Sequence, residues 1–368
     1  MLEVKYFDKE IEVGSNKVNP ISLFKDYFRN YRDVNGLAKK NFEYDKTVSL
    51  ETKDAQLNKA IIAAVEENLN MKKPANLSFE QWANFSNVKE MAFAIVSAMI
   101  DAVLPETLID DIGVYTDVRT GAFGDSFAFD IKPRELFTVS QSGHGKRTAF
   151  IQKQFKGTKT LVPVNHEVTV ETSLYKVLAG KESLAEFSAK VVRSIESQMT
   201  YDCYDAMHAA LTAMSMPAEL KLTGFTQNGA IELAQRVTAW NGGHAAMFVG
   251  TKNALNKILP YNANYRYDLE SDYVKIAHVK EFGGYALMEL PQVADYASTN
   301  FGLKLDDNTV YVISPTADKL VKLGIEGSVL SYVSKIDGNA NLTQDATFNK
   351  SWDAQVITSA IAGSITVA

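Results

Sequence analysis

The first 75 residues are polar and rich in lysine, asparagine and aspartate, with one stretch of helical spacing. From Asp54 to Leu69 apolar residues recur every three or four positions, which predicts an amphipathic helix. The rest of this arm is predicted to be extended. An arm with so little apolar content is either disordered or lies on another surface, and we favour a neighbouring copy of the chain as that surface.

Two longer helices are predicted further along the chain. A capping box at residues 78–81 precedes a helical run over 82–104, which Pro105 is expected to end. A second capping box, at residues 183–186, begins a helix that extends to about Met214 and has one apolar face. At 1.5 Å per residue this helix spans about 48 Å, which predicts an elongated subunit built along a spine.

Between these helices the apolar spacing changes to period two, which is typical of strands. The alternation is clearest at Phe127, Phe129 and Ile131. Further strand-like segments, and the turn between them, are residues 136–140, Gly143-His144-Gly145, 148–155 and 160–170. Together these segments predict a long hairpin from about Asp125 to Lys159.

The predicted hairpin is basic within an acidic chain. Its cations are Lys132, Arg134, Lys146, Arg147, Lys153, Lys156 and Lys159, against Asp125, Asp130 and Glu135. A long two-stranded ribbon is at best marginally stable alone, so it is either mobile or docked on a second surface. We interpret the seven cations as candidates for contact with an acidic patch of a sister subunit. A solvated charged face, or contact with nucleic acid through the lysines with Phe150 and Phe155, are the alternatives.

The remainder of the chain predicts a mixed lobe and a β-rich end. The elements of the lobe are a helix over 230–240, a strand over 245–249, a short helix capped by Thr251, and strands over 285–290 and 309–313. Strands over 329–333, 353–357 and 360–367 are predicted to return to the spine. The chain therefore has more than one structural part, as expected for its 368 residues.

Composition excludes several classes of protein. With 46% hydrophobic and 22% charged residues the chain can bury a sizeable core, so global disorder is excluded. A net charge of −6 disfavours a generic role in binding nucleic acid. The single cysteine, Cys203, cannot form an internal disulfide, which fits a reducing compartment. Residues 1–10 do not resemble a secretory signal, and the longest apolar stretch, 91–100, is too short to span a bilayer.

Sequence signals of catalysis are absent. There is no Gly-x-Ser-x-Gly elbow, His-Glu-x-x-His helix, phosphate loop or dinucleotide fingerprint. We interpret His166 as a half-exposed strand residue, His144 as a turn residue, and Cys203 as part of the apolar face of the spine. Gly242-Gly243-His244 is interpreted as a connection from helix to strand. We therefore predict no catalytic residue, no metal site and no cofactor.

Three local stretches then point to a family. They are Phe-Val-Gly-Thr-Lys-Asn-Ala-Leu at 248–255, Phe-Gly-Gly-Tyr at 282–285, and Val-Tyr-Val-Ile-Ser-Pro with Asp-Lys-Leu-Val-Lys-Leu-Gly-Ile-Glu-Gly within 310–327. With the order of arm, basic hairpin, spine, α/β lobe and β-rich return, the chain resembles the tailed-bacteriophage major capsid proteins of the Hong Kong ninety-seven fold. The resemblance covers about residues 85–368 and is less distinct over the first 75 or so.

The resemblance implies an α+β fold made of several parts. These are an N-terminal arm over 1–84, an extended hairpin loop over 125–160, and an axial α/β domain over 218–327. A peripheral domain would be formed by 85–124, by 161–217 with the spine helix, and by the C-terminal strands in 328–368.

The resemblance also implies a function, that of a capsid protein and not of an enzyme. Such a protein assembles with itself into hexamers and pentamers of an icosahedral shell, around double-stranded DNA that it encloses without sequence-specific binding. The implied partners are scaffold, portal or head-decoration proteins, with no membrane, and the implied location is the virion after assembly in the host cytoplasm. Some members crosslink a loop lysine to a neighbour's asparagine. Lys146, Lys153 or Lys156 with Asn349 would be such pairs, but the sequence does not specify the acidic residue that this reaction needs.

Two other functions remain open. An encapsulin-like nanocompartment shell shares the fold but typically lacks so long an arm and hairpin. A soluble α/β hydrolase or transferase would be a monomer with a pocket near Gly242 to His244. The acidic partner of the basic hairpin is also open, with Glu196 and Asp202 of the spine as candidates.

Overall fold

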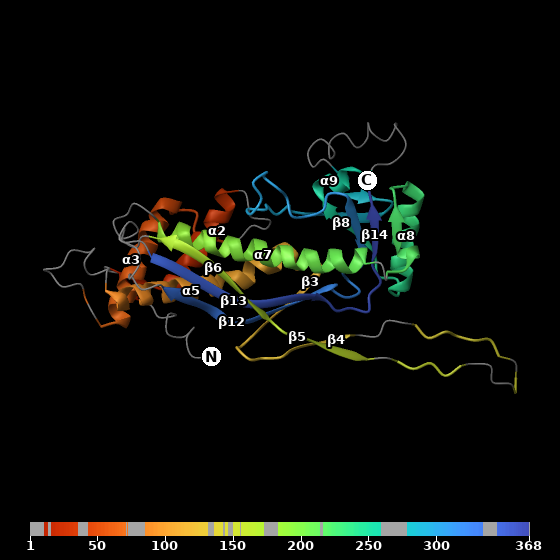
Figure 1. Cartoon of the computed structure of the whole chain (residues 1–368), viewed down its shortest axis with the longest axis horizontal. Helices are drawn as coiled ribbons and strands as arrows, with labels where there is room; N and C mark the ends of the chain where they lie inside the picture. The colour runs from red at the N-terminus through yellow and green to blue at the C-terminus, as the bar shows by residue number, and fades with distance from the viewer. Residues whose placement is uncertain are drawn as a thin grey trace.

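A computed structural model of the chain describes residues 11–13, 16–35, 43–70, 72, 85–131, 136–142, 144–145, 150–154, 156–172, 183–213, 216–258, 278–333 and 344–367. Its longest helix, α7 (Leu184–Thr212), runs along the length of the body (Figure 1). The Ser183 hydroxyl accepts a hydrogen bond from the Glu186 N–H at 2.9 Å and so caps the helix. The predicted spine and its capping box are confirmed.

A four-stranded sheet lies along the spine. Its strands, in spatial order, are β3 (Thr116–Gly121), β12 (Val321–Val333), β13 (Gln344–Val356) and β6 (Val164–Thr172). β12 is parallel to β3 and antiparallel to β13, and β13 is antiparallel to β6. The helix α5 (Ser86–Ile112) contacts β12, α7 contacts β13, and the two helices contact each other. Both helices therefore cover one face of this sheet.

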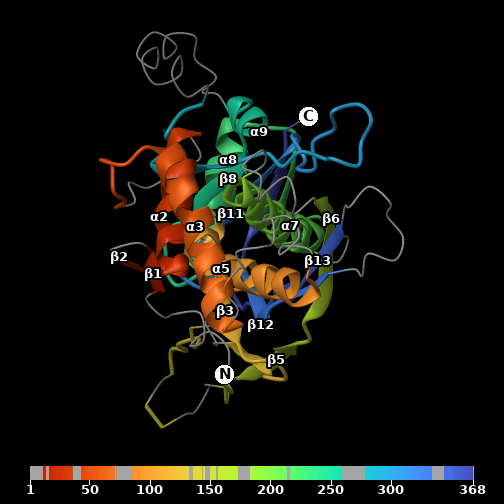
Figure 2. The same cartoon turned by 90° about the vertical axis from the view of Figure 1, so that its left-hand side faces the viewer.

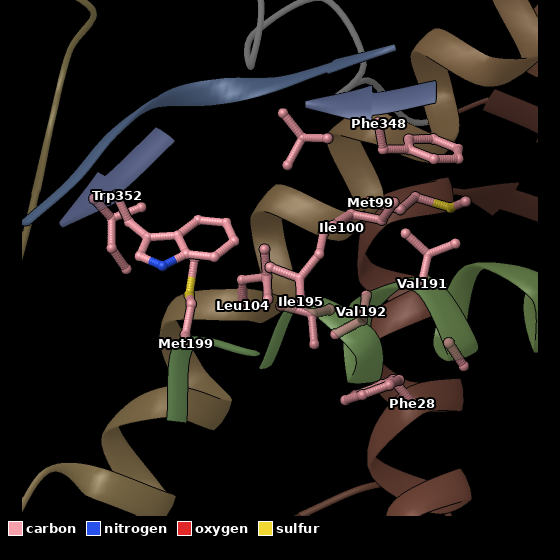
Figure 3. Close-up of a cluster of buried hydrophobic side chains, with 14 of the residues drawn as sticks. Phe28, Met99, Ile100, Leu104, Val191, Val192, Ile195, Met199, Phe348 and Trp352 are labelled. Atoms are coloured by element: carbon pink, nitrogen blue, oxygen red, sulfur yellow. The ribbon is translucent and has the colours of Figure 1, made fainter. Parts of the chain in front are cut away.

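The main core fills the space between this sheet and these helices. Figure 3 labels its centre: Met99, Ile100 and Leu104 from α5, Val191, Val192, Ile195 and Met199 from α7, Phe28, and Phe348 and Trp352 from β13. These side chains are almost completely buried. Because apolar burial contributes about 25 cal/mol for each Å² removed from water, this layer is the main source of stability.

The helix α5 does not end at Pro105, as the sequence predicts, but continues to Ile112. A proline inside a helix removes one backbone hydrogen bond. Leu104 and Ile112, on either side of it, are both buried in the main core, and their burial offsets that loss. The predicted beginning of this helix, at residues 78–82, lies outside the described residues.

In its described residues the N-terminal region packs on its own chain. A short hairpin of β1 (Ile11–Val13) and β2 (Asn16–Val18) is followed by α2 (Pro20–Val34) and α3 (Leu50–Asn68). Figure 2 shows α2 and α3 beside α5 and α7, and each of the first two contacts both of the others. The helix predicted from Asp54 is confirmed and begins at Leu50. The prediction that the rest of the arm is extended is wrong for residues 20–34, which form α2.

The reason is an aromatic stripe on α2. Phe24, Tyr27 and Phe28 recur at helical spacing and are buried in the main core. The helix also has a normal beginning, because the side chain of Asn19 accepts a hydrogen bond from the Ile21 N–H at 2.9 Å. A short aromatic stripe is enough to attach a mostly polar segment to the body.

We expect N19A to lower the free energy of unfolding by about 1 kcal/mol, because it removes the cap of α2. N19D keeps a capping oxygen and should have nearly the stability of the original chain. Denaturant unfolding of the unassembled subunit measures both. Equal stability of N19A and N19D would mean that the Asn19 side chain does not stabilise α2 as its cap.

A second sheet forms the other end of the body. Its six strands are, in spatial order, β7 (Lys221–Thr223), β14 (Gly363–Thr366), β11 (Thr309–Ile313), β8 (Met247–Thr251), β10 (Tyr285–Leu290) and β9 (Glu281–Phe282). The short helix η1 (Ala218–Leu220) precedes it, and α8 (Gln227–Trp240) and α9 (Lys252–Asn256) connect its strands. The strands β10 and β11 have the predicted bounds, and Thr251 caps α9 as predicted.

The last strand corrects one expectation about the C-terminal segment. β12 and β13 belong to the sheet along the spine, but β14 lies between β7 and β11 in the six-stranded sheet. Residues 328–368 therefore do not all complete one sheet. The mixture of helices and two sheets confirms the α+β class, while the domain boundaries themselves stay a prediction.

A network of hydroxyl groups joins the six-stranded sheet to the spine. The Tyr311 hydroxyl on β11 lies 3.1 Å from the Tyr204 hydroxyl and 2.6 Å from Nδ1 of His208, both on α7. The Tyr204 hydroxyl also accepts a hydrogen bond from the Asp306 N–H at 2.8 Å. Burial raises the pKa of Tyr311, so the phenol stays protonated and able to donate. The two sheets are thus fixed relative to each other.

Candidate assembly surfaces

The predicted hairpin projects away from the body, as Figure 1 shows at its lower right. Its base is a ladder of β4 (Phe127–Ile131) and β5 (Gly157–Leu161), which pair antiparallel from Phe127 with Leu161 to Ile131 with Gly157. Phe127, Phe129 and Leu161 are buried together with Ile357 in a small cluster separate from the main core. The first predicted strand and the base of the predicted hairpin are confirmed.

Beyond the base the two arms of the hairpin are extended without a strand ladder in their described residues. Residues 136–140, which the sequence predicts as a strand, form none, and neither do residues 150–154. The arms are still joined, because the Gln152 side chain accepts from the Thr138 N–H and donates to the Thr138 carbonyl, each at 2.8 Å. One side chain thus replaces a pair of ladder hydrogen bonds.

Large apolar side chains lie exposed on the outer half of this hairpin. They are Leu136, Phe137, Val139, Phe150 and Ile151, with Val139 93% and Phe150 88% exposed. Soluble monomers rarely gather exposed apolar groups in this way, so such a group marks an interaction site. The contact residues predicted from the sequence are the cations of the hairpin, with only Phe150 and Phe155 among its apolar residues. The adjacent apolar residues Leu136-Phe137 and Phe150-Ile151 are the sequence feature that indicates this exposed apolar surface.

Of the seven predicted contact cations, the structure describes Lys153, Lys156 and Lys159, all exposed on the hairpin. Lys132, Arg134, Lys146 and Arg147 lie outside the described residues. The Lys156 Nζ lies 3.6 Å from the carboxylate of Asp130. The Thr158 hydroxyl and then the Lys156 ammonium lower the pKa of Asp130, so this carboxylate is ionised at neutral pH.

An acidic surface lies on the four-stranded sheet, on the face that α5 and α7 do not cover. It consists of the outward-facing side chains of β6, β13 and the outer part of β12: Glu167, Thr169, Glu171, Leu330, Tyr332, Asp345, Thr347 and Asn349. We call it the acidic sheet face. It has three carboxylates, no cation among these eight residues, and two exposed apolar side chains, Leu330 and Tyr332. Its charge is therefore opposite to that of the hairpin.

The two spine carboxylates considered as partners of the hairpin are engaged within the subunit. Glu196 is buried and accepts from the Arg32 guanidinium of α2 at 3.2 Å. Asp202 accepts from the Trp352 indole N–H and from the Gln198 amide, each at 2.7 Å. Both carboxylates tie elements of one subunit together.

A third exposed surface is a tight loop between β10 and β11. Tyr296 and Phe301 are 88% and 97% exposed at its tip. Its ends are joined by a hydrogen bond from the Asp295 N–H to the Gly302 carbonyl at 2.8 Å and by a bridge between Ala294 and Leu303. The loop holds two aromatic rings in solvent.

The residues considered as candidates for catalysis or metal binding lie in strands, turns and the core. His166 is half-exposed on β6 and stacks on the Trp352 ring at 3.7 Å, and His144 is exposed in a turn. Cys203 is buried, and this burial raises the pKa of its thiol. Gly242 and Gly243 have φ values of +70° and +87°, as a connection after a helix requires. In the described part of the chain no group of three histidine, cysteine or acidic residues is arranged to hold a metal, and no helix is long and apolar enough to cross a membrane.

The chain also matches a known protein family in sequence. The sequence profile of the family described as "SPbeta prophage-derived putative capsid protein YonB" matches residues 30–366. The chain belongs to this phage capsid protein family. A phage capsid protein assembles into a shell and is part of the virion, so the resemblance and the predicted capsid function are confirmed. None of the curated proteins matches the chain.

Solved capsid structures are similar at low sequence identity. The bacteriophage PhiM1 mature capsid has a TM-score of 0.44 and 10% identity, covering 69% of this chain and 86% of that one. The satellite phage P4 procapsid, a structure that includes its size determination protein, has a TM-score of 0.46 and 6% identity, covering 72% and 89%. A virus-like particle from Pyrococcus furiosus has a TM-score of 0.42 and 10% identity, covering 72% and 97%. At these scores the family assignment rests on the sequence profile.

Proposed function

We propose that this capsid protein is the main building block of its shell and forms the hexamers and pentamers of an icosahedral head around double-stranded DNA. It acts without catalysis, metal or cofactor. Scaffold, portal or head-decoration proteins are its other partners, and assembly takes place in the host cytoplasm. The encapsulin-like alternative has less support, because the matching family is a prophage capsid family.

The observation that carries this proposal is the apolar outer half of the hairpin. This segment leaves the body and exposes five large apolar side chains to water, which is unfavourable in a monomer. Covering each of these side chains in a contact between copies would stabilise that contact. Many copies of one moderate contact stabilise a closed shell, although no single contact is strong. A hairpin of this kind is therefore suited to a subunit that acts only in an assembly.

The acidic sheet face of a second copy is the proposed acceptor of the hairpin. The hairpin supplies exposed cations at Lys153, Lys156 and Lys159, and the face supplies carboxylates at Glu167 and Glu171. Apolar residues lie among the charges on both partners. Within one subunit the outer half of the hairpin points away from the labelled ends of β6 and β13, so its docking on this face takes place between copies (Figure 1). Such opposite charges favour docking in one orientation.

Weak attraction for DNA also fits a container. A protein that holds nucleic acid tightly needs clustered cations, and this chain has a net charge of −6. An interior with little affinity for phosphates allows the genome to enter and leave. The enclosed DNA is then a cargo and not a ligand.

Light scattering and negative-stain electron microscopy of the purified chain test the proposal, over a range of salt and protein concentrations. Rings, tubes or shells are the expected result. A scaffold protein encoded with the chain is added where the chain alone stays monomeric. A monomer under every condition, with and without that scaffold, would contradict the proposed role.

We expect the double charge reversal K153E/K156E to reduce shell yield roughly ten-fold or more, because it places like charges opposite the acidic sheet face. Thermal unfolding should be nearly unchanged, since both lysines are exposed. Adding E167K/E171K to the same chain restores the opposite charges and should restore assembly. If the quadruple variant assembles no better than the double variant, the acidic sheet face is not the acceptor.

A further inference from the structure

The base of the hairpin rests on two glycines of the sheet along the spine. Gly121 on β3 and Gly324 on β12 face the ring of Phe127, the first residue of β4. A Cβ atom at Gly324 would lie 3.0 Å from Cγ of that ring, and one at Gly121 would lie 2.9 Å from its Cζ. Neither glycine is among those with positive φ. Glycine is therefore required here by space and not by backbone conformation.

Two further contacts from the same two strands hold the base. Arg119 on β3 places its guanidinium carbon 4.1 Å from the centre of the Phe129 ring and donates a hydrogen bond to the Ala128 carbonyl at 2.9 Å. Glu326 on β12 accepts from the Gly124 N–H at 2.6 Å, in the turn that leads into β4. The base of the hairpin is thus held by three contacts: the Phe127 ring on Gly121 and Gly324, which we call the seat, the Arg119 guanidinium and the Glu326 carboxylate.

The length of the hairpin amplifies any change at this base. Extended chain rises about 3.3 Å per residue, so the roughly 14 residues from Phe127 to Gln141 reach at most about 46 Å. A tilt of about 10° at the base would then move the outer end by about 8 Å, more than the spacing of neighbouring strands. A docking contact between copies tolerates far less than this displacement.

The seat is separate from what stabilises the body. Phe127 belongs to a cluster of four buried residues, whereas the main core lies between the helices and the sheet. A change at the seat therefore acts on the direction of the hairpin more than on the folding of the subunit.

We propose that Phe127, seated on Gly121 and Gly324, is a positioning residue that sets the direction of the hairpin for docking on a second copy. The inference rests on the proposed role of the hairpin in assembly. The added methyl of G324A would displace the ring and turn the hairpin, and the smaller side chain of F127L would make room for that methyl. The double variant F127L/G324A should therefore be closer to the original chain than G324A alone.

Distances between spin labels on the unassembled subunit test this directly. Labels at S142C on the hairpin and Q235C on α8 are both at exposed positions, and the native Cys203 is buried and does not compete. We expect G324A to shift or broaden the label distance by up to about 8 Å for a tilt of about 10°. F127L/G324A should recover much of the original distance and of the shell yield. The control G250A adds a methyl where the contacts are ordinary, the nearest at 3.4 Å, and should leave the distance unchanged.

Unchanged distances in G324A would overturn the inference, whatever happens to assembly or to the melting temperature. So would a double variant with the same altered distance as G324A. Failure of the proposed hairpin docking is recognised separately, because G324A would then change the label distance without changing shell yield.

Discussion

Replacing two exposed apolar side chains of the hairpin, V139S/F150S, should nearly abolish shell assembly while leaving the subunit folded. Val139 and Phe150 make no contribution to the core, since both are almost fully exposed in the subunit. Covering them in a contact between copies is worth about 3–5 kcal/mol for the pair, at about 25 cal/mol for each Å² of apolar area. Their loss would weaken each contact about a hundred-fold to several thousand-fold.

Sedimentation velocity and electron microscopy of assembly reactions measure this loss, with denaturant unfolding as the test of folding. The control S140A changes a polar residue on the same arm and should assemble normally. The free energy of unfolding should be the same in all three chains. Normal shell yield from V139S/F150S would show that the outer half of the hairpin is not buried in the shell.

Features fixed by neighbouring residues could be predicted from the sequence. The spine follows from the capping box at Ser183 and an apolar face that continues for many turns. The strands β10 and β11 are short apolar runs bounded by turn residues, and their bounds were predicted correctly. The helix α2 was also within reach, because Asn19-Pro20 and the aromatic spacing after it are typical of a capped helix. Its polar surroundings concealed this pattern.

Features that depend on contacts distant in sequence could not be predicted. Nothing local indicates that α5 continues past Pro105, since burial of residues on both sides decides it. The place of β14 between β7 and β11 depends on pairing across the whole axial part. The seat of Phe127 on Gly324 joins residues nearly 200 positions apart. Of the assembly surfaces, the cations of the hairpin can be predicted from the sequence. The exposure of its apolar side chains cannot, because it depends on the fold.

The ion pair between Asp101 and Lys350 holds the bulge of β12, the strand that carries Leu330 and Tyr332 of the acidic sheet face. Lys350 on β13 is buried and donates to the Asp101 carboxylate at 2.7 Å and to the Gly327 carbonyl at 2.5 Å. The same carboxylate accepts from the Val329 N–H at 2.6 Å. The register of β12 on β13 shifts here, between Glu326 and Leu330. One buried ion pair therefore joins α5, β13 and the bulge.

We expect D101L to lower the free energy of unfolding by about 3–5 kcal/mol, because it leaves the Lys350 ammonium buried without its counter-charge. K350M should be destabilising for the matching reason. The double variant D101L/K350M removes both charges and should cost less than the two single changes added together, since no uncompensated charge remains. Its bulge is still released, so its shell yield should stay low even where its stability recovers.

Guanidinium unfolding of the four chains gives the coupling free energy of the pair, and electron microscopy gives the shell yield. The control K190M removes an exposed partner of Glu186 on the spine and should cost no more than about 0.5 kcal/mol. Strictly additive single changes would mean that the pair is not coupled. Recovery of both stability and assembly in D101L/K350M would mean that packing alone shapes the bulge and the acidic sheet face, and that the ion pair serves only to neutralise its own buried charges.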